Sequence, residues 1–281
     1  MSRFRPAAIS AALVLLLAAP ADAADARARI TYDVYVGGVR MLEVQSNLAL
    51  AAESYDVDLS AHVVGIAATF SDWRSNVRSM GALDGPKVRP ASNTVQRING
   101  DSDKTTTITF LGGGRMDVVI VPSSKPKREQ TIPPRQLVDA LDPLSGVVSI
   151  LQALRVGSAA CSGRVPVFDG RRLYVADLAD GGSVALAKTD LGIYGGAAQR
   201  CTLTLTPAVG DLNFGDAKPN GRASDYMQGG GGQVPGRRII DTWLASPGRG
   251  LPAVPVRIES ESPWGRVVVH LRAIEGRGSG A

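Results

Sequence analysis

Apolar and polar residues alternate in short segments along most of the chain. The first segment runs from Ile30 to Val36 and meets Gly37-Gly38, and a second alternating segment follows as far as Leu50. A period of two is typical of a half-buried strand, and two glycines suit a tight hairpin because neither resists positive φ. The pattern therefore predicts antiparallel pairing from the start of the chain.

The alternation continues, and most of the alternating segments end at turn residues such as Asp84-Gly85-Pro86, Asn99-Gly100-Asp101 and Asp169-Gly170. Further extended segments are predicted at 55–59, 70–77, 93–98, 105–111, 116–121, 201–206, 239–244, 254–259 and 266–274, and 165–175 is predicted to be a hairpin. We expect a mostly β fold, an antiparallel meander that forms a curved, spiral or partly open β-barrel. Gly215 to Gly236 is rich in Gly, Pro and polar residues and is predicted to be a surface loop.

One region, about 134–156, has helical periodicity instead. Apolar residues recur at helical spacing from Leu137 to Leu141 and again from Leu144 to Leu154. Asp142 suits the N-cap of the second helix, with Pro143 at its first position. We expect this region to plug a barrel end or to cover an open sheet edge. The alternative is that its apolar stripe docks a partner.

The N-terminus has the layout of an export signal. A basic head ends at Arg5, an apolar run follows, and Ala21-Asp22-Ala23 offers the small residues that a signal peptidase reads. We expect residues 1–23 to be removed, with Ala24 as an alternative end point, and residues 24–281 to form a single periplasmic domain without a transmembrane anchor. A retained N-terminal membrane anchor is the alternative.

The two cysteines, Cys161 and Cys201, lie in the mature part of the chain. In an oxidising compartment such a pair is most simply a disulfide. A catalytic cysteine is the competing interpretation, and it would need a histidine that lowers the thiol pKa. Neither histidine, His62 or His270, is near a cysteine in the sequence.

Charge and histidine content argue against several classes of function. The net charge is +5, and removing residues 1–23 lowers it to +4, with no basic stripe of the kind that nucleic-acid binding needs. The two histidines lie in strand-like segments without the close spacing of zinc ligands. We therefore expect no nucleic-acid partner, no metal and no cofactor.

No catalytic residue stands out. A Gly-x-Ser-x-Gly elbow is absent from the sequence. Paired carboxylates would suffice for glycoside cleavage, and the candidates are Asp169, Asp177, Asp180 and Asp241, none of which lies in a motif. We expect a non-enzymatic protein, with a paired-carboxylate hydrolase as a lesser alternative.

Several short motifs stand in order along the mature chain. They are Asp142-Pro143-Leu144-Ser145, Pro166-Val167-Phe168-Asp169-Gly170-Arg171 with Tyr174, Cys201, Trp243-Leu244-Ala245 and Pro255-Val256-Arg257. Their order resembles an uncharacterised domain-of-unknown-function family of exported proteobacterial proteins, over nearly the whole mature chain. The resemblance implies export and β architecture and no activity. The candidate surface or helix-cap residues are Asp142, Ser145, Asp169, Arg171, Tyr174 and Trp243.

In overall plan the chain is also similar to periplasmic envelope-integrity proteins that form a spiral or partly open β-barrel with a disulfide, an analogy of architecture alone. We therefore expect support of envelope integrity, with the concave face of the sheet holding a periplasmic protein, peptide, lipid or cell-wall fragment. The alternative is a carrier of a hydrophobic, lipid-like ligand in a barrel pocket, with the helix as lid or plug.

Overall fold

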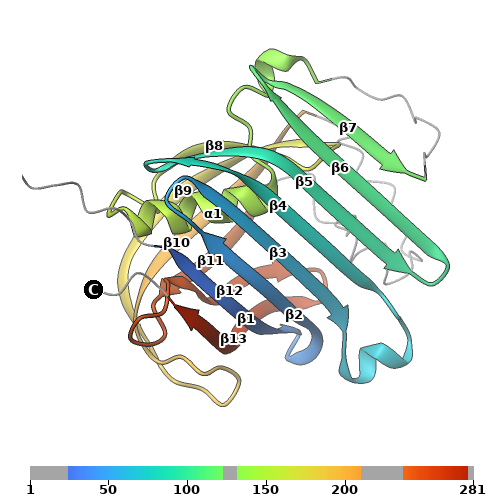
Figure 1. Ribbon diagram of the computed structural model, residues 1–281. Helices are drawn as coiled ribbons and strands as arrows, with labels where there is room; N and C mark the ends of the chain where they lie inside the picture. Colours follow the sequence, from blue (N-terminus) through green and yellow to red (C-terminus); the bar gives the residue numbers. More distant parts are fainter. Residues whose placement is uncertain (1–24, 123–131, 210–236, 278–281) are drawn as a thin grey trace, which may run out of the picture.

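The computed structural model describes residues 25–122, 132–209 and 237–277, which form one antiparallel sheet and one α-helix (Figure 1). The strands are β1 (Ala26–Val36), β2 (Val39–Leu50), β3 (Ser54–Val63), β4 (Arg74–Asp84), β5 (Lys87–Asn99), β6 (Ser102–Gly112), β7 (Arg115–Val121), β8 (Gly163–Phe168), β9 (Leu173–Leu186), β10 (Gly196–Val209), β11 (Arg238–Ala245), β12 (Val254–Ser262) and β13 (Gly265–Arg277). The helical elements are the 3-10 turns η1 (Gly65–Thr69) and η2 (Pro134–Gln136) and helix α1 (Pro143–Arg155).

The sheet consists of two meanders that meet at the first and last strands. Its order is β7-β6-β5-β4-β3-β2-β1-β13-β12-β11-β10-β9-β8, so every neighbour is sequential except the antiparallel pair β1–β13. Strands β7 and β8 are the two edges, and the sheet is not closed into a hydrogen-bonded barrel. The predicted mostly β, curved and partly open architecture is confirmed.

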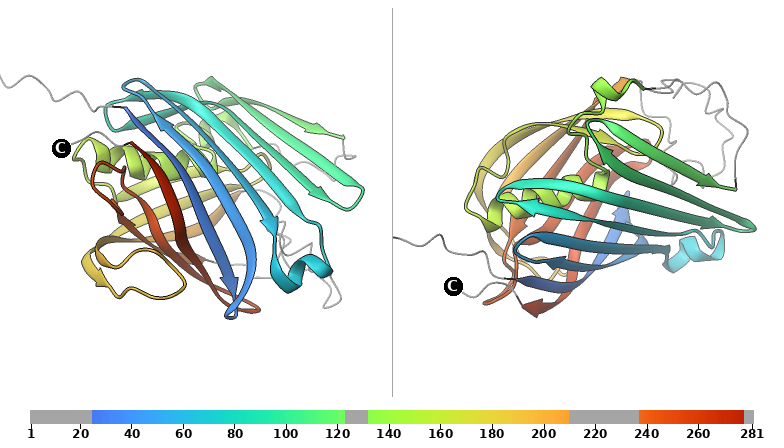
Figure 2. Two further views of the ribbon diagram at one scale, coloured as in Figure 1. Left: turned by 60° about the horizontal axis from the view of Figure 1, so that its bottom comes forward. Right: turned by 45° about the horizontal axis from the view of Figure 1, so that its top comes forward.

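Helix α1 joins the two meanders and lies on the concave side of the curled sheet. Figure 2 shows it between the blue-to-teal strands of the first meander and the yellow strands of the second. It packs against β4, β5 and β8. The alternation in β1 explains the packing, because Ala28, Ile30 and Tyr32 share one core with Val148 and Leu151 of the helix. We call the helix-facing side the concave face and the opposite side the outer face.

Apolar side chains fill the gap between the two edges of the sheet. Ile108 of β6 shares a second core with Phe168 and Leu173, which flank the β8–β9 turn. At Gly170, with φ +91°, a Cβ atom would stand 3.0 Å from Cγ2 of Thr106, so the turn approaches β6 closely where only glycine fits. We call this junction the seam.

Two local predictions were wrong. Residues 137–141 are not α-helical: Asp139 has φ +59°, and Leu141 forms a parallel bridge with Val167. The N–H of Leu141 donates to O of Pro166 at 2.9 Å, so this segment covers part of the β8 edge. Residues 70–77 were expected to be extended throughout, but η1 precedes Phe70, which is exposed, and β4 begins only at Arg74.

The predicted leader, 1–23, and the predicted loop, 215–236, lie outside the described residues. Within the described ranges, no helix has both the length and the apolar character needed to cross a membrane.

Candidate functional site

Asp142 caps helix α1 and ties it to the sheet. Its Oδ1 accepts hydrogen bonds from the backbone N–H groups of Leu144 and Ser145, each at 3.0 Å. From the sheet, Nδ2 of Asn93 donates to Oδ1 at 3.0 Å, and Oγ of Ser79 donates to Oδ2 at 3.0 Å. The predicted N-cap is therefore also the point where the helix is attached to β4 and β5.

Ser145 extends this contact to a third strand. Its hydroxyl donates to Asp142, lies 2.8 Å from Oγ of Ser79 and lies 2.6 Å from the hydroxyl of Tyr55. Asp142, Ser79 and Ser145 are fully buried. Burial raises the pKa of Asp142 above its usual value, and hydrogen bonds from both serines act in the opposite direction. We call the side chains of Asp142, Ser79, Ser145 and Asn93 the helix anchor. Because these side chains are closed to solvent, they hold the helix and do not face a substrate.

Contacts with the sheet also hold the C-terminal end of the helix. Arg155 donates to the carbonyl oxygens of Leu50, at 3.2 Å, and Ala51, at 2.7 Å. Six residues beyond the helix, Cys161 forms the predicted disulfide with Cys201 of β10, with a Cα–Cα distance of 5.2 Å. Both cysteines are buried and neither is free, so α1 is a fixed plug and the catalytic-cysteine alternative fails.

The remaining predicted residues are spread over the fold. Asp169 caps the β8–β9 turn by accepting from the backbone N–H groups of Arg171, at 2.9 Å, and Arg172, at 2.7 Å. Tyr174 lies at the start of β9, half-buried. Trp243 lies in β11, on the outer face. The six candidate surface or cap residues therefore do not form one site.

The four carboxylates considered for hydrolysis each make local contacts. Asp177 pairs with Arg164 at 2.7 Å, and Asp180 accepts from the N–H of Gly182 at 2.7 Å. Asp241 accepts from the hydroxyl of Thr202 at 2.6 Å and also pairs with Arg200 at 3.0 Å. Asp169 holds its turn. Among the described residues, no hydrogen bond or ion pair links any two of these four.

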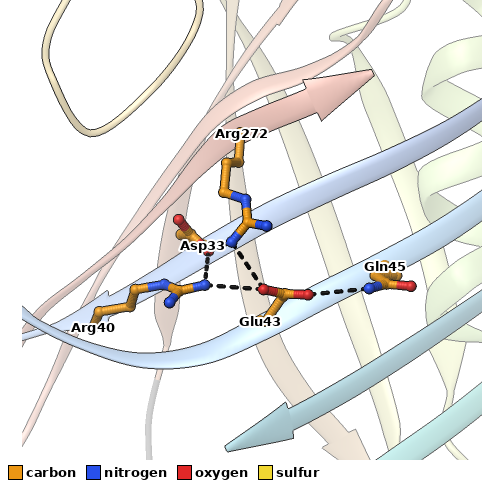
Figure 3. Close-up of polar contacts among 5 residues, drawn as sticks. All are labelled: Asp33, Arg40, Glu43, Gln45 and Arg272. Atoms are coloured by element: carbon orange, nitrogen blue, oxygen red, sulfur yellow. Dashed lines mark hydrogen bonds and ion pairs between the residues drawn. The ribbon is translucent and has the colours of Figure 1, made fainter. Parts of the chain in front are cut away.

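The outer face carries a compact set of charged residues near the β1–β13 junction (Figure 3). Arg40 pairs with Asp33 at 2.7 Å and with Glu43 at 3.0 Å, and Arg272 pairs with Glu43 at 2.9 Å. Gln45 donates to the second oxygen of Glu43 at 3.0 Å. Asp33 is only 6% exposed, so its charge is buried but compensated. We call this set the outer charge cluster.

Charged and aromatic residues continue this cluster across the second meander. In the strand register, Asp33 faces His270, His270 faces Arg257, and Arg257 faces Trp243. The guanidinium groups of Arg200 and Arg257 each lie 5.7 Å from the centre of the Trp243 ring. This row was not predicted from the sequence. The signal for it was Asp33, a charged residue between the apolar positions of a strand.

The outer charge cluster predicts a pH effect. The hydrogen bond from Gln45, and then the nearby charges of Arg272, His62 and Arg40, hold the pKa of Glu43 below its usual value of 4.5 against the effect of burial. A lowered native pKa stabilises the fold above the unfolded pKa, and this contribution is lost as the pH falls through the native pKa. We therefore expect Glu43→Gln to destabilise the protein at pH 7 and to have a smaller effect at about pH 3.

Urea unfolding at both pH values measures this effect, with the exposed Glu261→Gln as the matched control. An equal loss of stability at the two pH values would contradict the role given to the Glu43 charge.

The surroundings of the histidines were candidates for a metal or ligand site. Among the described residues, no three His, Cys, Asp or Glu side chains gather as metal ligands would. A hollow beside His270 and Arg257, lined also by Gly192 and Tyr194, has a volume of about 10 Å³. That is room for roughly one water molecule, so it is not a site for a lipid or peptide.

A broader surface lies on the concave face, beyond the part that α1 fills. The strand register places half-buried aliphatic side chains there from both meanders. We call them the concave band: Leu42, Val44, Leu59, Val77, Val95, Leu203, Ile240, Ile258, Val267 and Val269. The sequence pattern predicted most of the strands that carry these residues, and the structure brings the side chains onto one curved wall.

The chain matches a family model and is similar to a solved structure. A family model described as "Protein of unknown function (DUF3108)" matches residues 31–272. Among solved structures, the chain is similar to a "Beta-barrel-like Protein of Domain of Unknown Function DUF1849 from Brucella abortus", with 12% identity, 89% of this chain and 98% of that chain covered, and a TM-score of 0.45. No curated protein matches. The resemblance to a domain-of-unknown-function family is confirmed.

Proposed function

The chain belongs to the family of proteins of unknown function DUF3108, and from this premise we propose that it is a non-enzymatic periplasmic binding protein that supports cell-envelope integrity. Its partner is held on the concave band. The observation that carries the proposal is this wall of half-buried aliphatic side chains, which eight strands contribute and which lies beside a helix that is already fixed.

Most of the other candidate residues are already engaged by contacts within the fold. The four carboxylates considered for hydrolysis are engaged in turns or in ion pairs, and the buried serines belong to the helix anchor. The concave band, in contrast, retains apolar surface that is only partly covered. Covering such surface favours binding by roughly 25 cal/mol per Å² of apolar area removed from water.

Deletion and complementation test the proposal. Cells without the protein are expected to be sensitive to detergent, cell-wall antibiotics and osmotic stress, and the native chain is expected to restore resistance. Val77→Asn with Val95→Asn should abolish restoration, because both substitutions place amides in the concave band. The control is Val119→Asn on the exposed outer side of β7, where the native valine is 49% exposed.

Variants are compared only if their thermal unfolding matches that of the native protein. Deletion cells that resist all three stresses as well as the parent strain would contradict the proposal.

A second candidate function is a carrier of a hydrophobic, lipid-like ligand, and the aliphatic character of the concave band favours it. In this account α1 is a plug and not a lid. Hydrogen bonds attach both its ends to the sheet, and the disulfide attaches the segment that follows it. Protein purified from the periplasm should then contain lipid that organic solvent extracts. Lipid-free protein that also ignores fluorescent fatty-acid probes would remove this candidate.

A further inference from the structure

Four large apolar side chains are exposed at one end of the sheet. They are Val39 of β2, Ile66 in η1, Phe70 directly after η1 and Trp264 of the β12–β13 turn, and we call them the apolar rim. Phe70 is 84% exposed, the largest exposed fraction among the large apolar side chains that the structure describes, and Ile66 is 68% exposed. Single exposed apolar residues are ordinary on a protein surface, whereas a group of them marks a contact surface.

Backbone contacts bring the connections that carry these residues side by side. The N–H of Gly37, in the β1–β2 turn, donates to O of Arg266 at 3.0 Å, so this turn lies against the β12–β13 turn. The N–H of Val64 donates to O of Met41 at 2.9 Å, which fixes the start of η1 beside β2. In the left view of Figure 2, the blue β1–β2 turn and the cyan η1 lie at the same lower end of the sheet. The apolar rim is therefore one group on three neighbouring connections.

The three connections carry no charged residue at their tips. Segments 36–39, 64–71 and 262–265 contain no Asp, Glu, Lys or Arg. In the last of them, the hydroxyl of Ser262 accepts from the backbone N–H of Trp264 at 3.3 Å, which fixes the turn that presents the indole. Such tips can enter an apolar layer without the cost of burying a charge.

The buried side of η1 connects the apolar rim to the concave band. Ala67, inside η1, is buried in one core with Trp73. Leu42 and Val44 of the concave band pack against the same core. Apolar side chains therefore continue from the concave band to the exposed end of η1.

A lipid surface fits this end of the protein better than a protein partner does. The rim side chains stand on separate connections and not on one strand or helix face, and fluid acyl chains can close around each of them. Tryptophan is also enriched where a membrane meets water, because its indole is apolar apart from one N–H. The arginines that directly follow two of these turns, Arg40 and Arg266, already pair with carboxylates at 2.7 Å and 3.1 Å. Insertion of apolar side chains would therefore drive the contact.

We propose that the apolar rim docks on a phospholipid surface, with Ile66, Phe70 and Trp264 inserted at the boundary between headgroups and acyl chains. The inference goes beyond the proposed function, because it concerns a second surface and not the partner of the concave band. A peripheral contact of this kind is reversible, and it places the rim end of the concave band at the lipid surface.

The test compares the full mature chain with the double variant Ile66→Ser/Phe70→Ser. The control is Leu111→Ser/Val138→Ser, which also removes two exposed apolar side chains, but beside the β6–β7 turn at the opposite end of the sheet. Because all four side chains are exposed, thermal unfolding of both variants should match that of the native protein. The probes are vesicles of phosphatidylcholine alone and of phosphatidylcholine mixed with phosphatidylglycerol, measured by cosedimentation.

We expect the native protein and the control to bind both kinds of vesicle, and the double variant to bind at least about tenfold more weakly. Binding should persist at about 1 M salt, because salt screens charges and not apolar insertion. Equal binding by the native protein and the double variant, or no binding by the native protein, would overturn the proposal. Binding that needs phosphatidylglycerol and is lost in salt would assign the contact to charge and overturn it as well.

The fluorescence of Trp264 gives a readout that leaves η1 unchanged. Trp73 is buried and Trp243 is half-buried on the outer face, so lipid contact at the rim should shift the emission to shorter wavelength mainly through Trp264. Trp264→Phe should lose most of this shift. Vesicle binding without any change in the emission of the native protein would show that another surface meets the lipid, and would overturn the proposal.

Self-association is the competing use of an exposed apolar group. A native dimer that Ile66→Ser/Phe70→Ser dissociates, without vesicle binding, would assign the rim to a second copy of the chain and overturn the lipid contact. The complementation result for Val77→Asn with Val95→Asn is independent of each of these outcomes. Failure of this inference is therefore distinguishable from failure of the proposed function.

Discussion

Replacing Asp142 with alanine should lower the free energy of unfolding by roughly 2–4 kcal/mol. The loss of an N-cap costs about 1 kcal/mol. The remainder arises because Ser79 and Asn93, both fully or almost fully buried, lose their acceptor, and an unsatisfied buried polar group costs roughly 1–3 kcal/mol. For a chain of this size the melting temperature should fall by roughly 5–15 °C.

Two variants give this prediction its controls. Asp142→Asn keeps an oxygen for the N–H groups of Leu144 and Ser145, so it should cost less than alanine. Asp84→Ala removes an exposed carboxylate paired with Arg89 and should change stability little. If Asp142→Ala and Asp84→Ala had the same small effect, the helix anchor would not hold the plug.

Loss of the disulfide should have an effect of similar size. Cys161 and Cys201 are 40 positions apart, and in the chain-entropy model closing a loop of that length stabilises the fold by about 4 kcal/mol. Reduction should therefore lower the melting temperature of the native protein markedly. The bond also ties the segment after α1 to β10, so its loss should loosen the C-terminal end of the plug first.

Thermal unfolding with and without reductant measures this effect, and hydrogen exchange locates it. Cys161→Ala/Cys201→Ala is the control, because it should melt near the reduced native protein and should not respond to reductant. Identical melting of oxidised and reduced native protein would show that the bond does not stabilise the fold.

The sequence predicts local structure best where one residue type determines the backbone. Gly37 and Gly38 adopt φ of +57° and +86°, which is the hairpin that two adjacent glycines favour. Asp142 and Pro143 predict the start of α1 correctly, because a side-chain acceptor and a missing N–H both suit the first turn. The period-two alternation likewise predicts most strands.

Predictions from periodicity failed where long-range contacts determine the backbone. Leu137 and Leu141 are buried as a helical stripe would be, but their segment is drawn along the β8 edge by backbone hydrogen bonds to Pro166 and Phe168. Such pairing depends on the position of β8, which no local pattern reveals. The prediction of an extended segment at Phe70 was wrong for a similar reason. Phe70 is exposed, and apolar character alone does not place a side chain in a strand.

The candidate sites were harder to predict than the fold. The seam brings Ile108 against Phe168 and Leu173, far apart in sequence, only because the sheet curls until its two ends meet. The partners of Asp142 could have been suspected, since Ser79 and Asn93 are polar residues two positions from Val77 and Val95 on the same side of β4 and β5. Trp243 carried a family motif, but its place between two arginines followed only from the register.

Native mass spectrometry of the protein purified from the periplasm tests the central claim most directly. The account predicts a chain that begins after residue 23, has lost two hydrogens to the Cys161–Cys201 bond and retains a non-covalent ligand that dissociates on activation. A full-length chain with two free thiols and no retained ligand would contradict it.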